Sequence, residues 1–218
     1  MRRLLVVLLV LLVAAAGGWF YLQHHRPSLR GGETYGVDVS AHQGEIDWPA
    51  VAADDIDFAY LKATEGATFT DSMFVANWTA SGAAGVRRGA YHFFTLCSPA
   101  AAQAAHFLAV AGTQAELPPA LDLELNGNCG RRPSAADVDA EVTAFVTAVE
   151  KATAERVLLY VGEEFADRYR LSVTRGRDLW VRHLLRRPSG QWRVWQARDR
   201  AHVKGIRGSV DLDVGRWR

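Results

Sequence analysis

The stretches that decide the expected fold are DLWVRHL (178–184), QWRVWQA (191–197) and SVDLDV (209–214). Each is typical of a β-strand, because aliphatic and aromatic residues dominate it and polar turn residues flank it. The segments between them are too short and too polar for crossover helices, and a short connection favours antiparallel pairing. We therefore expect the chain to end in three bare antiparallel strands.

The region before these strands alternates between strand-like and helical segments. The strand-like segments are short and rich in β-branched or aromatic residues: YGVDVS (35–40), FAYLKA (58–63), GAYHFF (89–94), PALDLEL (119–125) and RVLLYVG (156–162). Each precedes a helical stretch, expected near 47–54, 72–84, 99–111, 135–153 and 163–170. Five β/α units and three bare strands make eight strands, the number that closes a filled barrel. We predict an α/β fold, a modified TIM-like barrel of five β/α units followed by three strands, with an open doubly wound sheet as the alternative.

The N-terminal segment is unlike the rest of the chain. Residues 4–22 carry no charge and, as a helix, would span about 28 Å, close to the thickness of a bilayer core. We predict an N-terminal hydrophobic helix that precedes the barrel, either a signal anchor or a cleaved signal peptide. The aromatic run at 19–21 favours the anchor, because aromatic residues gather at membrane interfaces.

The predicted organisation has three parts. Residues 1–22 are the signal anchor or signal peptide, residues 23–33 are a polar linker, and residues 34–218 are a single barrel domain. The barrel is expected outside the cytoplasm, tethered to the inner or cytoplasmic membrane by the N-terminal helix. If the signal is cleaved, the barrel is instead secreted or periplasmic.

Charge and composition narrow the partners. The formal net charge is only +1, but the arginines crowd late in the chain, which fits an acidic polymer as partner or a solvated basic face. Nucleic acid is not expected, because the chain is exported and no binding motif is recognisable. A monomer is expected.

The sharpest chemical feature is LDLEL (121–125), where two acids interrupt an apolar strand. Side chains alternate along a strand, so Asp122 and Glu124 share one face, opposite the leucines. Two acids that face a barrel interior raise the pKa of one of them, which gives the acid and carboxylate pair that glycosidases need. The wet face of an edge strand, or a metal site, is an alternative explanation of the same pattern.

Two further acids occupy comparable positions. Asp38 lies in the first predicted strand and Asp211 in the last. The first and last strands of a closed barrel are neighbours, so both side chains are expected to converge on the mouth that receives Asp122 and Glu124. The alternative is that Asp38 caps a turn and that Asp211 and Asp213 face solvent.

Several motifs follow one another along the chain from Tyr35 to Val214: YGVDVSAHQGEIDW (35–48), FAYLKATEG (58–66), GVRRGAYHFF (85–94), QAAHF (103–107), LDLE (121–124), LLYVG (158–162) and VDLDV (210–214). Together they resemble glycoside hydrolase family 25, the Chalaropsis-type lysozymes. The resemblance implies a barrel of five β/α units and three terminal strands. It also implies hydrolysis of the β-1,4 bond between N-acetylmuramic acid and N-acetylglucosamine in peptidoglycan, with no metal or organic cofactor.

The resemblance also implies roles for the four acids. Glu124 matches the general acid, and Asp122 matches the acid two residues before it. Asp122 then orients the 2-acetamido group of the substrate for attack on C1, or attacks C1 itself, and both routes retain the anomeric configuration. Asp38 and Asp211 match the remaining two active-site carboxylates. Glu124 has to be protonated to serve the leaving oxygen, and the surrounding carboxylates favour that state.

Four aromatic residues near strand ends are candidate substrate contacts. Tyr91 and Tyr160 lie in motifs that match the family, whereas Trp180 and Trp195 lie in the bare strands. We expect them to stack on sugar faces or to donate hydrogen bonds to sugars, although aromatic residues of barrels more often serve packing.

The chain departs from the family pattern beside these candidates. A small residue and an aromatic residue commonly follow the tryptophan of the sixth strand, and here Arg182 and His183 stand there. An aromatic residue is common after Trp195-Gln196, and here Ala197 follows. These changes leave the four acids intact and leave the glycan preference open.

Two other functions remain open. One is a metal-dependent hydrolase that uses Asp38, His42, Asp122 and Glu124 as ligands, although the chain has no H-x-H or HExxH spacing. The other is a catalytically silent wall-binding domain that keeps the fold, which the four intact acids argue against.

The two cysteines, Cys97 and Cys129, are predicted to form a disulfide. They follow the third and fourth predicted strands, so both lie on loops at the same end of adjacent barrel strands. Neighbouring strands run about 4.8 Å apart, which brings such loops within reach of the ~4.4–6.8 Å that separates the Cα atoms of a disulfide. An exported location supplies the oxidant.

Overall fold

A computed structural model describes residues 2–184 and 186–217 of the chain. Within these residues eight strands close into a barrel, and the last strand pairs with the first. In barrel order they are β1 (Glu33–Val39), β2 (Ile56–Glu65), β4 (Arg87–Phe93), β5 (Ala120–Leu123), β6 (Leu158–Val161), β7 (Leu179–Arg182), β8 (Val194–Ala201) and β9 (Val210–Arg216). A short extra strand, β3 (Phe69–Thr70), pairs with the end of β2. The predicted eight-stranded barrel is confirmed.

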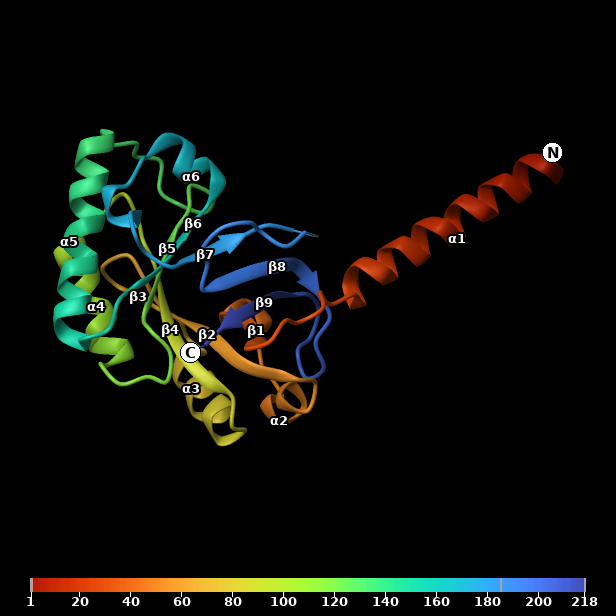
Figure 1. Cartoon of the computed structure of the whole chain (residues 1–218), viewed down its shortest axis with the longest axis horizontal. Coiled ribbons are helices and arrows are strands. Elements are labelled where there is room, and N and C mark those ends of the chain that lie inside the picture. The colour runs from red at the N-terminus through yellow and green to blue at the C-terminus, as the bar shows by residue number, and fades with distance from the viewer. Residues whose placement is uncertain (1, 185, 218) are drawn as a thin grey trace.

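Helices follow the first five barrel strands, as predicted. They are α2 (Trp48–Ala52), α3 (Phe74–Ala83), α4 (Ala100–Ala111), α5 (Ala135–Thr153) and α6 (Glu163–Arg168), with the short 3-10 helices η1 (Ala41–Gln43) and η2 (Ser172–Thr174) beside them. The start of α5 shows the local cause, since the Ser134 side chain accepts a hydrogen bond from the Asp137 amide at 3.2 Å. Figure 1 shows α4 and α5 side by side against one side of the barrel, where they pack on each other.

The pairing of two neighbouring strands differs from the prediction. β9 pairs antiparallel with β8 and with β1, but β7 and β8 pair parallel, with Val181 opposite Trp195. Residues 183–193 connect them, and a chain of that length reaches about 36 Å when extended, well beyond the length of β7. The connection therefore returns along the outside, and β8 starts from the same end of the barrel as β7. The expectation of antiparallel pairing for all three final strands is wrong.

Alternation along the strands divides the side chains into an inner and an outer set. The inner set fills the barrel below its mouth and consists of Phe58, Tyr60, Leu117, Ala120, Leu158, Tyr160, Trp180 and Val194. The outer set packs between the strands and the helices. It includes the fully buried Leu121 and Leu123 of β5, together with Phe107 of α4 and Phe145 of α5. The barrel is thus a packed core that supports a site at its open end.

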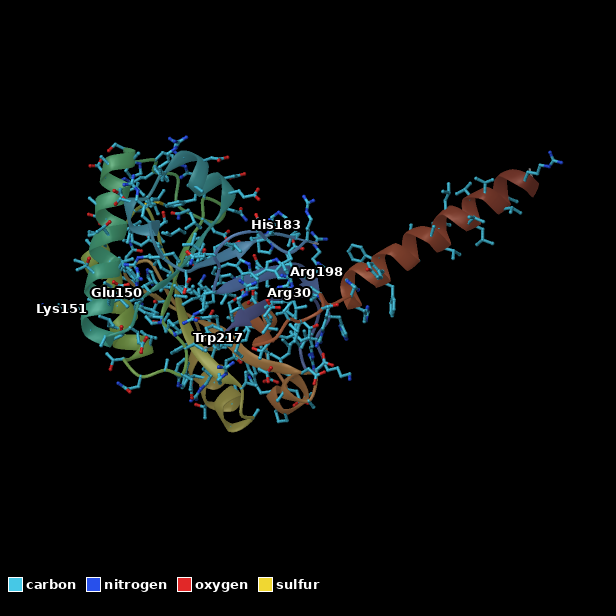
Figure 2. The ribbon with its side chains drawn as sticks, viewed as in Figure 1. Arg30, Glu150, Lys151, His183, Arg198 and Trp217 are labelled. Carbon is cyan, nitrogen blue, oxygen red and sulfur yellow. A yellow bond between two sulfur atoms is a disulfide. The ribbon has the colours of Figure 1, made fainter. Side chains whose placement is uncertain are left out.

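The connection after β7 completes the outer layer beside β8. Its Trp192 packs against Trp195, with ring centroids 6.0 Å apart. Arg187, from the same connection, donates to the buried Glu33 at the start of β1 at 2.6 Å. Figure 2 shows His183, where this connection begins, on the side of the molecule away from α5. A loop held by an ion pair therefore takes the place that helices take elsewhere around the barrel.

The N-terminal helix α1 (Arg2–His24) is present as predicted and extends away from the barrel (Figure 1). The apolar side chains at positions 5–13 are exposed. Over the residues that the structure describes, no helix combines the length and the apolar character that crossing a membrane requires. The predicted membrane anchor is therefore not supported.

Gly36 in β1 lies where the inner layer leaves no room for a side chain. A Cβ atom at this position would come within 2.3 Å of the Phe58 ring. Phe58 is fully buried and meets the Trp217 ring edge-on at 5.0 Å, so it has little room to move. We predict that Gly36→Ala lowers the free energy of unfolding by about 1–3 kcal/mol, the usual cost of overpacking, as measured by chemical denaturation.

Gly31→Ala is the matched control, because a Cβ atom at position 31 meets no atom within 4 Å. Equal free energies of unfolding for the two variants would show that the barrel interior tolerates a side chain at position 36.

Candidate active site

The carboxyl ends of the parallel strands surround a cavity of about 150 Å³. Seven strands contribute to its wall, which is formed by Asp38, Tyr91, Asp122, Glu124, Tyr160, Trp180, Gln196 and Asp211. The structure therefore brings together all four predicted acids and three of the four candidate aromatic contacts, although they lie far apart in the sequence.

The local geometry of the strands points the acids inward. Leu121 and Leu123 of β5 are fully buried in the outer core, so Asp122 between them and Glu124 after them face the cavity. Asp38 and Asp211 lie directly opposite each other in the antiparallel pair of β1 and β9. Opposite residues in such a pair have Cβ atoms about 4.5–5.5 Å apart, so these two carboxyls are forced together.

The cavity opens into a wider cleft of about 400 Å³. Glu124 and Asp211 line both spaces, and the cleft adds Arg182, which pairs with Asp199 at 2.7 Å. The cleft provides room beside Glu124 for part of a ligand larger than the cavity holds.

Burial and mutual repulsion set the protonation of the central pair. Burial raises the pKa of Asp122 well above its usual range, and the Glu124 carboxyl raises it further, whereas Lys62 opposes both. Burial also raises the pKa of Glu124, against a hydrogen bond from Tyr160 and the positive charge of Arg182. Groups that interact this strongly lose their protons as a pair. The pair is therefore suited to hold a proton at a pH at which isolated carboxyls are ionised.

The other two acids have raised pKa values as well. Burial, with the charge of Asp199, raises the pKa of Asp211 to about 6, although Arg182 and a hydrogen bond from Gln196 act in the opposite direction. Burial raises the pKa of Asp38 well above its usual range, and the carboxyls of β9 add to the effect. All four acids at the mouth thus favour the protonated state more than exposed acids do.

A chain of hydrogen bonds crosses the mouth from β5 to β9. The Tyr160 hydroxyl has a single hydrogen, which it donates to Gln196 Oε1 at 3.1 Å or to the neighbouring Glu124 carboxyl. The Gln196 side chain in turn hydrogen-bonds Asp211. Gln196 was not among the residues predicted for the site, yet it follows Trp195 in a strand, so alternation alone puts the two on opposite faces.

The two candidate tryptophans have different surroundings. Trp180 lines the cavity, and its Nε1 donates to Asp213 Oδ1 at 3.1 Å. Trp195 is buried on the outer face of β8, where its Nε1 donates to the carbonyl oxygen of His183 at 2.8 Å. The structure therefore places Trp195 outside the cavity.

Arg182 and Asp213 are among the charged residues in or beside the site that were not predicted as part of it. Arg182 lines the cleft next to Glu124 and Asp211. Asp213, for which a solvent-facing position was one expectation, is fully buried inside the barrel. Its inward direction follows from its spacing of two residues from Asp211, a signal that the sequence contains.

The predicted disulfide between Cys97 and Cys129 is confirmed, with Cα atoms 6.2 Å apart. It joins the loop after β4 to the loop after β5. Asn128, next to the bridge, donates to the carbonyl oxygens of Phe94 at 2.8 Å and of Glu124 at 2.9 Å. The backbone that carries Glu124 is thus held from both sides.

Comparison with known protein families identifies this arrangement. The family described as Glycosyl hydrolases family 25 matches residues 37–206, which make up most of the barrel. The chain belongs to glycosyl hydrolase family 25. It is therefore a glycoside hydrolase.

Relatives of this family 25 enzyme share both sequence and fold. The chain is 38% identical over 190 residues to Uncharacterized protein YegX of Escherichia coli O157:H7, covering 83% of this chain and 68% of the relative. It is 33% identical over 192 residues to Lysozyme M1 of Streptomyces globisporus, covering 81% of this chain and 65% of the relative. The solved structure of a family 25 glycosyl hydrolase from Bacillus anthracis matches with a TM-score of 0.79 at 32% identity, covering 89% of this chain and 94% of that chain.

Asp211 links the stability of the protein to pH. Its pKa is about 6 in the folded protein, above the value of about 4 for an unfolded aspartate. The folded state holds this proton more tightly, so the contribution to stability is full below pH ~4 and is lost as the pH rises through about 6. We predict that the free energy of unfolding falls less steeply between pH 4 and 7 in Asp211→Asn. The difference is on the order of 3 kcal/mol, and chemical denaturation at a series of pH values measures it.

Asp57→Asn controls for the loss of one carboxylate, because Asp57 is exposed and lies in β2 away from the cavity. Identical pH dependence in wild type and Asp211→Asn would contradict the assignment of a raised pKa to Asp211.

Proposed function

We propose that this family 25 hydrolase is a muramidase, which cuts the β-1,4 bond between N-acetylmuramic acid and N-acetylglucosamine in peptidoglycan with retention of configuration. The observation that carries the proposal is the meeting of Asp38, Asp122, Glu124 and Asp211 around one cavity. The relative named Lysozyme M1 supports the choice of substrate.

Glu124 is the general acid in this proposal. It lies where the cavity opens into the cleft, so it reaches a bond between a sugar in the cavity and a sugar in the cleft. Burial favours its protonated form, and the hydrogen bond with Tyr160 orients the carboxyl. Glu124 gives its proton to the leaving oxygen, so the leaving sugar departs as an alcohol and not as an unstable alkoxide.

Asp122 assists from the deeper side of the cavity. The positive charge of Lys62 favours its ionised form, and Lys62 is itself held by Glu65 at 2.7 Å. The Asp122 carboxylate accepts the N–H of the 2-acetamido group, whose carbonyl oxygen attacks C1 as the leaving group departs. Water then attacks C1, with Glu124 acting as the base, and the two displacements retain the configuration. Direct attack by Asp122 is the alternative and has the same stereochemical outcome.

The other residues of the cavity wall bind and shape the substrate. Tyr91, Tyr160 and Trp180 offer aromatic faces and polar groups to a sugar ring, as carbohydrate sites commonly do. Asp38 and Asp211 complete the ring of acids. Trp195 has no such role, because it faces the outside of the barrel.

The enzyme acts outside the cytoplasm, where peptidoglycan lies. The Cys97–Cys129 disulfide supports this location, because disulfides persist in oxidising compartments. We take residues 34–218 as the catalytic domain, working as a monomer without a metal or an organic cofactor.

Glu124→Gln is predicted to lower kcat about 100-fold or more, because the amide has the shape of the acid but no proton to give to the leaving oxygen. Folding and glycan binding should change little. The measurement is mass spectrometry of fragments released from purified peptidoglycan, and wild type should release fragments with N-acetylmuramic acid at the reducing end.

Activity of Glu124→Gln within a few-fold of wild type would contradict the assignment of the acid. Asp122→Asn should also be severely impaired. If Asp122→Asn were harmless while Asp211→Asn abolished activity, the division of roles would be wrong. Fragments that end in N-acetylglucosamine would contradict the proposed bond.

The two alternative functions predict different results in the assay on purified peptidoglycan. Over the residues that the structure describes, no three or more His, Cys, Asp and Glu side chains are arranged to hold a metal ion. Activity that a chelator abolishes and a divalent metal restores would nevertheless favour the metal-dependent hydrolase. A folded protein that binds peptidoglycan and releases no fragment would favour the silent wall-binding domain.

A further inference from the structure

We propose that Asp213 is a positioning residue that shares one proton with Asp38 and so keeps negative charge away from Asp122. The inference rests on the proposed function, in which Asp122 works as a carboxylate. It assigns a role to a fifth acid that lies beneath the four acids of the mouth.

The position of Asp213 requires an explanation, because it is an acid with no exposed surface. β9 places it two residues after Asp211, on the same inward face. Its Oδ1 accepts a hydrogen bond from Trp180 Nε1 at 3.1 Å. A buried carboxylate needs further partners to offset the loss of water, and the indole alone is one donor.

The second partner is Asp38, from the neighbouring strand β1. Asp38 is opposite Asp211 in the ladder, so Asp213 is its diagonal neighbour on the same face, and the two side chains hydrogen-bond. The Oδ2 atoms of both carboxyls are buried, and neither receives a donor group from the other side chains that the structure describes. Two carboxyls bond to each other only when one carries a proton, so a single shared proton supplies the missing partner.

The shared proton resides on Asp38. Burial raises the pKa of both acids, but Trp180 and Asp38 both donate to Asp213, which favours its ionised form. The buried Oδ2 of Asp38 receives no such donor within the described part of the chain, and the charges of Asp211 and Asp122 lie around this carboxyl. The pair therefore carries one negative charge, on Asp213. Asp38 presents a neutral carboxyl to the cavity, whose wall does not include Asp213.

The groups that face this pair come from several strands. They are Asp211 of β9, Asp122 of β5, Tyr60 of β2, Tyr91 of β4 and Tyr160 of β6, with Lys62 of β2 as the cation beside Asp122. Burial raises the pKa of all three tyrosines, so they stay neutral. The carboxyls of Asp122 and Asp211 are then the facing groups whose charge changes in the acidic range.

Asp213→Asn tests the proposal, since the new side chain keeps Oδ1 for Trp180 and offers Asp38 an N–H donor. Asp38 then ionises, and the negative charge moves onto the cavity wall beside Asp122. A nearer negative charge raises the pKa of Asp122. We predict that the acidic limb of kcat/KM against pH, which follows ionisation of Asp122, moves up by about one pH unit.

Asp38→Asn is the matched variant in the same hydrogen bond. Its N–H donates to Asp213 and leaves the charge on Asp213, so the acidic limb should keep its wild-type position whatever the change in rate. Asp57→Asn removes an exposed carboxylate of β2 and should change neither limb nor rate. An unmoved limb in Asp213→Asn, or an equal shift in Asp38→Asn, would overturn the proposal.

Infrared difference spectroscopy of the substrate-free protein tests the shared proton without any activity. Wild type should show the band of a protonated carboxyl, and Asp38→Asn should lose it. Because this comparison does not need Asp213→Asn, it tests the proposal even if that variant does not fold. Failure to lose such a band would overturn the shared proton even in an active muramidase. If the protein shows this band but releases no peptidoglycan fragments, the shared proton is supported and only the proposed function is overturned.

Discussion

The arrangement of the molecule depends on strand β9, which pairs antiparallel with β1 on one side and with β8 on the other. This pairing closes the barrel and places Asp211 directly opposite Asp38. It also points Asp213 into the barrel interior, where Trp180 Nε1 donates a hydrogen bond to it. If β1 and β9 did not pair, β1 would be an edge strand of an open sheet, and Asp38 would lie far from Asp211. The cavity with its four carboxyls therefore exists only in the closed barrel.

The acids that make the site reactive also make it costly. Burial raises the pKa of Asp122 and Glu124, which favours keeping a proton on the pair at a pH at which exposed acids are ionised. The same burial means that the folded protein loses stability as the pH rises and these groups ionise. The Cys97–Cys129 disulfide acts in the opposite direction. With a sequence separation of 32 residues, it contributes roughly 3–4 kcal/mol by the chain-entropy estimate, and it restrains the loop after Glu124.

Much of the fold and the ring of acids could be predicted, because alternation in LDLEL and the neighbourhood of first and last strands are direct consequences of strand and barrel geometry. The parallel pairing of β7 with β8 could not, because the length of residues 183–193 permits either a direct turn or a return along the outside. Trp195 shows a second limit. A strand such as QWRVWQA has apolar residues on both faces, and a shift of one residue exchanges the inner and outer sets. The hydrogen bonds of Gln196 and Asp213 depend on side chains from several strands that meet inside the barrel. The sequence alone does not show which of these side chains come into contact.

The closed barrel raises the pKa values of Asp211 and Glu124 above those of exposed acids. Carboxyl carbon NMR of the substrate-free protein, labelled at aspartate and glutamate and titrated with pH, tests this claim most directly. Single Asp→Asn and Glu→Gln variants assign the signals. We predict that Asp211 titrates at about pH 6 and that Glu124 titrates above the usual range for a glutamate. Midpoints near 4 for both Asp211 and Glu124 would contradict it.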